Sequence, residues 1–300
     1  MVLEIKKAQR SQSKMRLLLS WASGSGKTYS ALRLGKGLCK WDMSKVCVID
    51  TEHNSASLYS DLWDYSVLQL DPDNCTTDLL CEAFDTIENA WFEVIVWDSS
   101  SHWWQRCLEK NDQFTKQNYG NSFTSWRQTN KFYVKMINRM LSSPCHVIAT
   151  ARSKSDYVIE QNEKWKTQIK KVWLKAETRS WYDFEFTVCL DINEMHMVDK
   201  VAKDRTWIFV WREEPFMITE NTGNEILKWC ETGVIPEVKK QLEVQPQPAK
   251  KDLPEISDER FAKACDVISK WEATVESLLD HFKLSENQQN IVNELFLKKA

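Results

Sequence analysis

The chain has 300 residues, of which 42% are hydrophobic, and its formal net charge is -3. This length and apolar content allow one substantial core and a small second module. The near-neutral charge excludes attraction of the whole chain to nucleic acid or anionic lipid, so a polyanion site has to come from a local cluster of Lys and Arg.

The nine cysteines include no C-x-x-C pair, which predicts reduced thiols and a cytoplasmic location. No run of about 18 apolar residues occurs, so we expect neither membrane insertion nor a membrane partner.

Apolar runs alternate with amphipathic segments of helix length, a rhythm typical of an α/β fold with a mainly parallel sheet flanked by helices. Taken in chain order, the predicted elements are a strand at 15–20, a helix at 27–40, a strand at 45–50, a helix at 76–89, a strand at 94–98, a helix at 124–141 and a strand at 146–150. Extended runs at 184–190, 195–201 and 207–210 predict antiparallel strands at the sheet edge, and a core helix follows at 224–230.

Composition predicts two modules joined by a linker. Residues 1–236 form the large domain, with its core at about 14–233. Residues 237–257 contain Gln-Pro-Gln-Pro and little apolar content, which is typical of a linker. Residues 258–300 are helical in pattern and predict a small C-terminal helical module at the edge of independent stability.

The first predicted strand leads into Trp-Ala-Ser-Gly-Ser-Gly-Lys-Thr and then a helix, the arrangement of a phosphate-binding loop, or P-loop. Loop amides can donate to phosphate, the Lys27 ammonium can reach the outer phosphates, and the Thr28 hydroxyl can bind Mg²⁺. The candidate phosphate-binding residues are Ser23, Gly24, Ser25, Gly26, Lys27 and Thr28. The alternative is a glycine-rich turn that opens an ordinary helix.

Two further strands end in carboxylates. Asp98 ends the strand at 94–98 and is the candidate Mg²⁺ ligand that complements Thr28. Asp50 and Glu52 follow the strand at 45–50, and Glu52 is the better candidate to orient and deprotonate an attacking water. Alternatively, both residues cap the segment that follows.

These motifs resemble the RecA-like P-loop ATPases, and specifically the short RecA-like ATP-binding proteins of the AAA family found in phage genomes. The resemblance covers about residues 14–233 and implies ATP and Mg²⁺ as cofactors. It implies the catalytic role for Glu52, and it makes Thr150 or Arg152 a γ-phosphate sensor on a strand that leads to a second DNA-binding loop.

The resemblance also includes Lys203-Asp204-Arg205, which is similar to the K-x-R element that reaches a neighbouring subunit's ATP in hexamers and filaments. Lys203 and Arg205 are therefore candidate catalytic residues, since alternate residues of a strand share a face and can neutralise phosphoryl charge. The alternative is a solvated edge strand guarded by charge.

The segment 152–179 is locally basic, with eight Lys or Arg against four Asp or Glu. Aromatic residues interleave with these charges, as in a platform that pairs with a nucleic-acid backbone and stacks on bases. The candidate DNA-binding residues are Arg152, Lys154, Lys164, Lys166, Lys170 and Lys171. A flexible solvated loop is the alternative.

The function implied by the resemblance is ATP hydrolysis coupled to single-stranded DNA in phage-type recombination or replication, by a homo-oligomeric ring or filament in the host cytoplasm. The C-terminal helices are predicted to recruit a recombination or single-strand-binding protein. The alternative function is an ATP-switched loader or scaffold with little direct DNA activity. A nucleotide kinase is disfavoured, because no arginine-rich lid is present.

The chain has 15 Trp and only 7 Gly, whereas average usage would give roughly 21 Gly. Trp21 occupies the first glycine position of the phosphate-binding loop, where a side chain crowds the turn. Other tryptophans in glycine-like contexts are Trp63, Trp173, Trp181, Trp207 and Trp211. One hypothesis is that several are glycines encoded by UGA and misread as Trp. The alternatives are stacking on DNA bases and core filling.

Overall fold

The computed structural model describes residues 7–161, 167–234, 254–269, 278 and 282–292, with the backbone alone for 154–161, 167–175, 268–269 and 286. The chain divides into two compact units, Met1–Pro236 and Glu237–Ala300. In the described part of the chain, no helix has the length and apolar composition needed to cross a bilayer.

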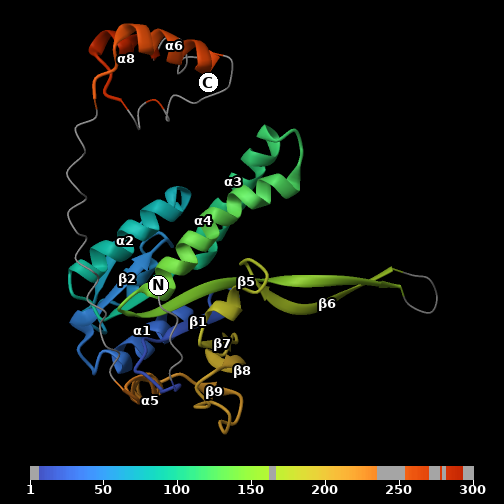
Figure 1. Cartoon of the computed structure of the whole chain (residues 1–300). Helices are drawn as coiled ribbons and strands as arrows, with labels where there is room; N and C mark the ends of the chain where they lie inside the picture. Colours follow the sequence, from blue (N-terminus) through green and yellow to red (C-terminus); the bar gives the residue numbers. More distant parts are fainter. Residues whose placement is uncertain (1–6, 162–166, 235–253, 270–277, 279–281, 293–300) are drawn as a thin grey trace. The chain divides into compact units, whose positions relative to one another are not determined.

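A mainly parallel sheet forms the centre of the first unit (Figure 1). The strands β3, β2, β4, β5, β1 and β7 run parallel, each to its neighbour, and β8 and β9 add antiparallel strands at one edge. In sheet order the bounds are β3 (Ser66–Gln69), β2 (Val46–Asp50), β4 (Val94–Asp98), β5 (His146–Gln161), β1 (Arg16–Trp21), β7 (Val188–Ile192), β8 (Met197–Asp204) and β9 (Phe216–Met217). The predicted fold class is confirmed.

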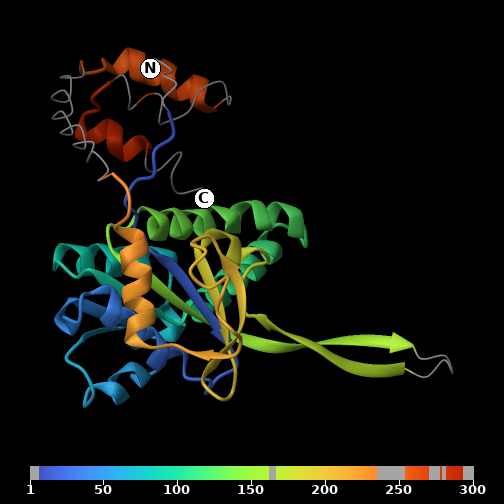
Figure 2. The same cartoon turned by 90° about the horizontal axis from the view of Figure 1, so that it is seen from below.

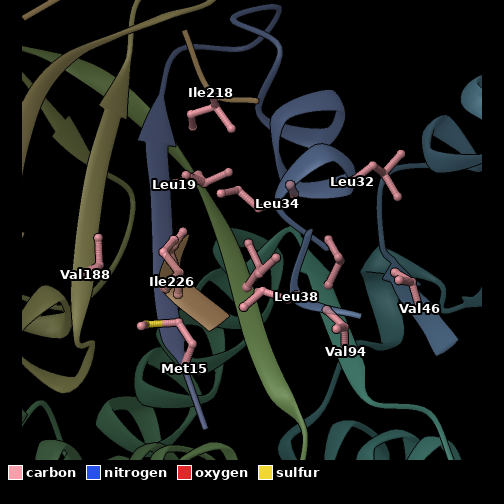
Figure 3. Close-up of a cluster of buried hydrophobic side chains, with 14 of the residues drawn as sticks. Met15, Leu19, Leu32, Leu34, Leu38, Val46, Val94, Val188, Ile218 and Ile226 are labelled. Carbon is pink, nitrogen blue, oxygen red and sulfur yellow. The ribbon is translucent and has the colours of Figure 1, made fainter. Parts of the chain in front are cut away.

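Helices cover both faces of this sheet because its strands are apolar on both sides. Leu17 and Leu19 of β1 lie in one core cluster with α1 (Lys27–Leu38) and α5 (Glu220–Cys230), which Figure 3 shows in part. Leu18 points to the opposite face. That face packs against α2 (Thr77–Asn89), α3 (Ser100–Gln117) and α4 (Ser122–Ser142).

Two glycines let α1 and α5 approach closely. A Cβ on Gly37 would lie 2.1 Å from the Glu220 carbonyl oxygen, and one on Gly223 would lie 2.3 Å from that of Leu34. No side chain fits at either position, so the contact between these helices fixes α1, which follows the phosphate-binding loop.

The sequence patterns missed two elements, β3 and the long helix α3. They also gave a wrong strand at 207–210. The Asp204 carboxylate accepts hydrogen bonds from the amides of Thr206, Trp207 and Phe209, and these bonds fold the segment into a loop instead. Short 3-10 turns occupy Met43–Lys45, Ser55–Tyr59, Pro72–Asn74 and Tyr182–Glu185, so the predicted strand at 184–190 begins only at Val188.

The basic segment predicted as a loop is a two-stranded antiparallel ribbon. Strand β5 continues past the sheet to Gln161, and β6 (Thr167–Ala176) pairs back along it from Gln161↔Thr167 to Ser153↔Ala176. Figures 1 and 2 both show this ribbon extending away from the body of the first unit. The ribbon strands contain short apolar runs rich in β-branched and aromatic residues, at 157–159 and 172–174, which are typical of strands but are flanked by charged residues.

The second unit has a small core of its own. Helices α6 (Asp258–Ser269) and α8 (Glu286–Val292) lie within the predicted helical module, and the linker residues 237–253 lie outside the described residues. The buried apolar side chains of this unit are Ile256, Phe261, Leu278, Leu284 and Val292.

His146 couples strand packing to pH. Its buried Nδ1 accepts a hydrogen bond of 3.1 Å from the Met15 amide, and burial, with Lys14 and Arg16 nearby, lowers its pKa from 6.5 to about 3. The folded protein therefore binds fewer protons here than the unfolded chain, so stability is lost as pH falls below about 6.5, by about 1.4 kcal/mol per pH unit.

We predict that His146→Asn, which keeps an acceptor near the Met15 amide, lowers the stability at pH 8. Between pH 6 and 4 the variant should lose about 1.4 kcal/mol less stability per pH unit than the wild type. Urea unfolding at several pH values measures both effects. An unchanged slope in the variant would contradict the assignment.

Candidate functional site

The loop between β1 and α1 wraps a cavity of about 220 Å³ at the carboxyl end of the sheet. Gly24 and Gly26 have φ values of 84° and 80°, in the left-handed region that favours glycine. The helix beyond Gly26 leaves its first amides without intrahelical partners, as every helix does, and this is a favourable place for an anion. The predicted phosphate-binding residues that line the cavity are Ser23, Gly24, Gly26, Lys27 and Thr28.

The Lys27 ammonium lies at the loop and donates to the carbonyl oxygens of Trp21 and Ala22, at 3.1 and 2.7 Å. Burial lowers the pKa of Lys27, while Asp98 and Glu52 act to raise it. The ammonium thus rests on neutral carbonyls, within a cavity whose charged groups include two carboxylates.

Asp98 connects three elements at the floor of this cavity. One carboxylate oxygen accepts a hydrogen bond of 2.5 Å from the Thr28 hydroxyl, and the other accepts one from Thr150 on β5. The side chain is 1% exposed, and burial, reinforced by Glu52, raises its pKa to about 6. A buried carboxylate in this state favours a cationic partner.

The donor set at Asp98 fits Mg²⁺. A hydroxyl and a carboxylate, from Thr28 and Asp98, are hard oxygen ligands, and they already lie within hydrogen-bonding distance of each other. Within the described residues no cluster of three or more His, Cys, Asp or Glu forms a metal cage. This suits an ion that keeps several waters and shares the rest of its coordination with phosphate.

The structure separates the roles of the two carboxylates after β2. Asp50 accepts hydrogen bonds from the amides of Glu52 and Ala56, at 2.6 and 3.0 Å, so it caps the turn that follows. Glu52 makes no such cap and lines the phosphate cavity. The capping alternative therefore describes Asp50 and not Glu52.

Arg152 lies at this site, away from the ribbon that follows it. Its Nε donates to Glu52 Oε1 at 2.9 Å, and its backbone amide donates to the Ser101 hydroxyl. Arg152 was predicted both as a DNA-binding residue and as a phosphate sensor, and its position suits the second role. Lys154, Lys170 and Lys171 lie on the ribbon backbone, while Lys164 and Lys166 lie outside the described residues.

Lys203 and Arg205 do not line the phosphate cavity of their own chain. Lys203 donates to the carbonyl oxygens of Asp183 and Phe184, at 3.0 and 2.6 Å, and Arg205 is exposed just after β8 ends. Strand β8 ends at Asp204, between the two residues, and burial together with the nearby charge of Arg205 lowers the pKa of Lys203, so the two cations lie near each other. Their reach to a neighbouring subunit's ATP stays a prediction.

Four residues of the cavity wall were not predicted from the sequence: Ser55, Leu58, Tyr59 and His196. His196 lies in the turn between β7 and β8 and contacts the loop from the far edge of the sheet. Its position depends on long-range packing, so no local pattern indicates it.

Trp21 ends β1, and its φ is not positive. The crowding that we expected at this position therefore does not place its backbone in the left-handed region.

No protein of curated function matched the sequence. A solved structure, a KaiC-like protein (PH0186) from the hyperthermophilic archaeon Pyrococcus horikoshii OT3, is similar at 16% identity and a TM-score of 0.36, over 64% of this chain and 79% of that one. Residues 13–212, two thirds of the chain, match the AAA domain family AAA_24. The chain therefore belongs to this AAA domain family.

Proposed function

We propose that the protein hydrolyses ATP in phage-type DNA recombination or replication and couples the nucleotide to single-stranded DNA. The observation that carries this proposal is the continuity of β5. One strand supplies Thr150 to Asp98, then Arg152 to Glu52, and then runs into the protruding basic ribbon. Residues that sense the nucleotide and residues suited to DNA thus share one unbroken backbone.

The chain's own groups can perform the hydrolytic step. Loop amides and Lys27 bind and orient the phosphates, and Thr28 and Asp98 hold Mg²⁺, which supplies charge neutralisation when bound. Glu52 accepts the proton of a water aligned with the terminal phosphate. Before that step the ion pair between Glu52 and Arg152 has to break, since a carboxylate held in an ion pair is a weaker base.

The ion pair between Arg152 and Glu52 supplies a physical link to DNA. A terminal phosphate in the cavity offers Arg152 a more highly charged partner than Glu52, and a guanidinium binds phosphate in a fixed fork. A shift of Arg152 moves the strand at the root of the ribbon. Two sites that bias one element in this way are coupled reciprocally.

We extend the proposal to a homo-oligomer, a ring or filament, in which exposed Arg205 reaches the nucleotide of a neighbouring subunit. Lys203 stabilises the start of the loop that carries Arg205, because it donates hydrogen bonds to the carbonyl oxygens of the turn at Tyr182–Glu185. The loader or scaffold function has one specific observation in its favour, the separate core of the second unit.

The first prediction separates the two carboxylates after β2. Glu52→Gln removes the proton acceptor and should lower kcat about 100-fold or more, with ATP affinity nearly unchanged. Asp50→Asn weakens the cap and should lower Tm, with a much smaller loss of kcat. Steady-state hydrolysis and thermal unfolding of both variants check this, and equal kcat losses would argue against the assigned roles.

The second prediction concerns the ribbon. Replacing Lys164, Lys166, Lys170 and Lys171 with Gln should weaken binding of a single-stranded oligonucleotide and reduce the slope of log K against log salt by about 0.7 for each phosphate that no longer pairs with a lysine. DNA stimulation of ATP hydrolysis should disappear, while the rate of hydrolysis without DNA stays unchanged.

Lys27→Ala should abolish hydrolysis with and without DNA.

The matched control for the ribbon replaces four exposed lysines elsewhere, Lys116, Lys131, Lys228 and Lys263. These changes remove the same charge and should leave DNA binding within about twofold. DNA binding at the wild-type level after ribbon neutralisation would contradict the role of the ribbon. Capture of a partner protein that persists after ribbon neutralisation, but disappears on truncation at Pro254, would favour the loader function instead.

A further inference from the structure

A second cavity, of about 450 Å³, adjoins the phosphate cavity. The two share Gly26, Tyr59 and His196 in their walls. The remaining wall of this side cavity consists of Tyr29, Ser30, Arg33, Met217 and Ile218. Phosphates held by the loop and the helix N-terminus have to extend their organic part away from Lys27, and the side cavity is contiguous with that path.

The side cavity has the chemistry of a site for a flat aromatic group. The Tyr29 and Tyr59 rings lie 5.7 Å apart and tilted by 50°, and Met217 and Ile218 add apolar surface. Arg33 is held by Glu220 at 3.0 Å, so its charge is already paired. Ligand sites of this kind are mostly apolar and aromatic, with a few placed polar groups.

His196 lies where the two cavities meet. A Cβ on Gly26 would lie 2.6 Å from its Nδ1, so the imidazole packs directly on the phosphate-binding loop. The turn that carries it is fixed, since the Asn193 side chain accepts hydrogen bonds from the amides of Met195 and Met197, at 2.9 and 3.2 Å. An imidazole placed there contacts the ligand between its base and its phosphates.

We propose that the side cavity binds the nucleoside part of the nucleotide, with Tyr29 and Tyr59 packing on the base and His196 contacting the nucleoside beside the phosphates. This deepens the proposed function and rests on it. Tyr29 is then a specificity-determining residue: it contributes to ATP affinity but contributes nothing to a ligand that has phosphates alone. His196 lines both cavities, so its contribution to ATP exceeds its contribution to phosphates alone.

Calorimetry with Mg²⁺-ATP and with Mg²⁺-tripolyphosphate tests this proposal. Tyr29→Ala should weaken ATP about tenfold, a typical loss for one stacked contact, and leave tripolyphosphate within about twofold. His196→Ala should weaken ATP more than it weakens tripolyphosphate. Tyr29→Phe should retain ATP affinity, and Tyr119→Ala, at a fully exposed tyrosine, should change neither ligand.

Unchanged ATP affinity in the Tyr29 and His196 variants, or equal loss of both ligands, would overturn the nucleoside site and leave the P-loop intact. A wild-type protein that binds neither ligand would overturn the proposed function itself.

A separate observation concerns the tryptophans. Nine non-glycine residues of the described chain have positive φ, and four of them are tryptophan: Trp41, Trp91, Trp181 and Trp207, with φ between 64° and 73°. A bulky side chain is strained in this region, which glycine adopts at no cost. The four indoles are exposed by 51%, 82%, 73% and 74% respectively, so burial does not offset the strain.

The positions themselves favour glycine. Trp91 follows Ala90, the last capping residue of α2, where helices most often place a left-handed glycine. Trp41 closes the end of α1 with a 2.9 Å bond from its amide to the Lys36 carbonyl. Of the positions that the sequence singled out, Trp181 and Trp207 have positive φ, whereas Trp63 and Trp211 do not.

Other tryptophans behave as core residues. Trp97 and Trp103 are buried, and their rings lie 5.5 Å apart. The Trp103 indole also donates to the Thr77 hydroxyl at 3.0 Å. These six tryptophans thus fall into two groups: Trp97 and Trp103 at positions suited to a buried indole, and the four with positive φ at positions that favour glycine.

We infer that Trp41, Trp91, Trp181 and Trp207, together with Trp21 of the phosphate-binding loop, are glycine in the protein made by its own organism, through a codon that this organism reads as glycine. The first four positions would then adopt their left-handed turns without strain, and at position 21 the loop would regain the glycine that a phosphate-binding motif has first.

The gene sequence and peptide masses from the source cells test this inference. The five positions should share UGA and yield glycine-containing peptides, while Trp97 and Trp103 should be encoded by UGG. As an independent check, Trp91→Gly and Trp181→Gly should each raise Tm by about 2–4 °C, and Trp103→Gly should lower it. UGG at position 21 or 181, or a lowered Tm in the first two variants, would overturn the inference.

Discussion

The rest of the site depends on one buried carboxylate, that of Asp98. It ends a strand in the middle of the sheet and accepts hydrogen bonds from Thr28, at the start of α1, and from Thr150, on β5. Parallel strands deliver their carboxyl ends to one edge, so the phosphate loop, a magnesium ligand and Glu52 come together without a special connection. Burial raises the pKa of Asp98, which means that its carboxyl group is costly to ionise and gains from a cation.

Strand β5 connects this edge of the sheet to the ribbon. It lies between β4 and β1, so both Asp98 and the phosphate-binding loop are beside it, and it alone continues beyond the sheet into the ribbon. Arg152 marks the point where the strand leaves the core, and its partner there is Glu52. A nucleotide that competes for Arg152 acts at the root of the element that we propose binds DNA, and no hinge or second domain is required for that coupling.

Much of the core was predictable from the sequence, because buried strands and amphipathic helices have local patterns. The P-loop, Asp98 and Glu52 were found because each follows directly on a strand. Features that depend on distant parts of the chain were not found. His196 reaches Gly26 from a turn about 170 residues away, and the Asp204 carboxylate turns an apolar run into a loop. The ribbon was predicted as a loop because its many charged residues outweigh its short apolar runs at 157–159 and 172–174. The pairing of Arg152 with Glu52 spans one hundred residues, and no periodicity indicates it.

The central claim is that Arg152 transmits the state of the nucleotide site to the ribbon. Its most direct test is the affinity of a labelled single-stranded oligonucleotide, measured by fluorescence anisotropy with and without Mg²⁺-ATP, for the wild type and for Arg152→Ala. The account predicts that ATP changes the wild-type affinity and that Arg152→Ala binds DNA with an affinity that no longer responds to ATP. An ATP response that persists without the guanidinium would contradict it.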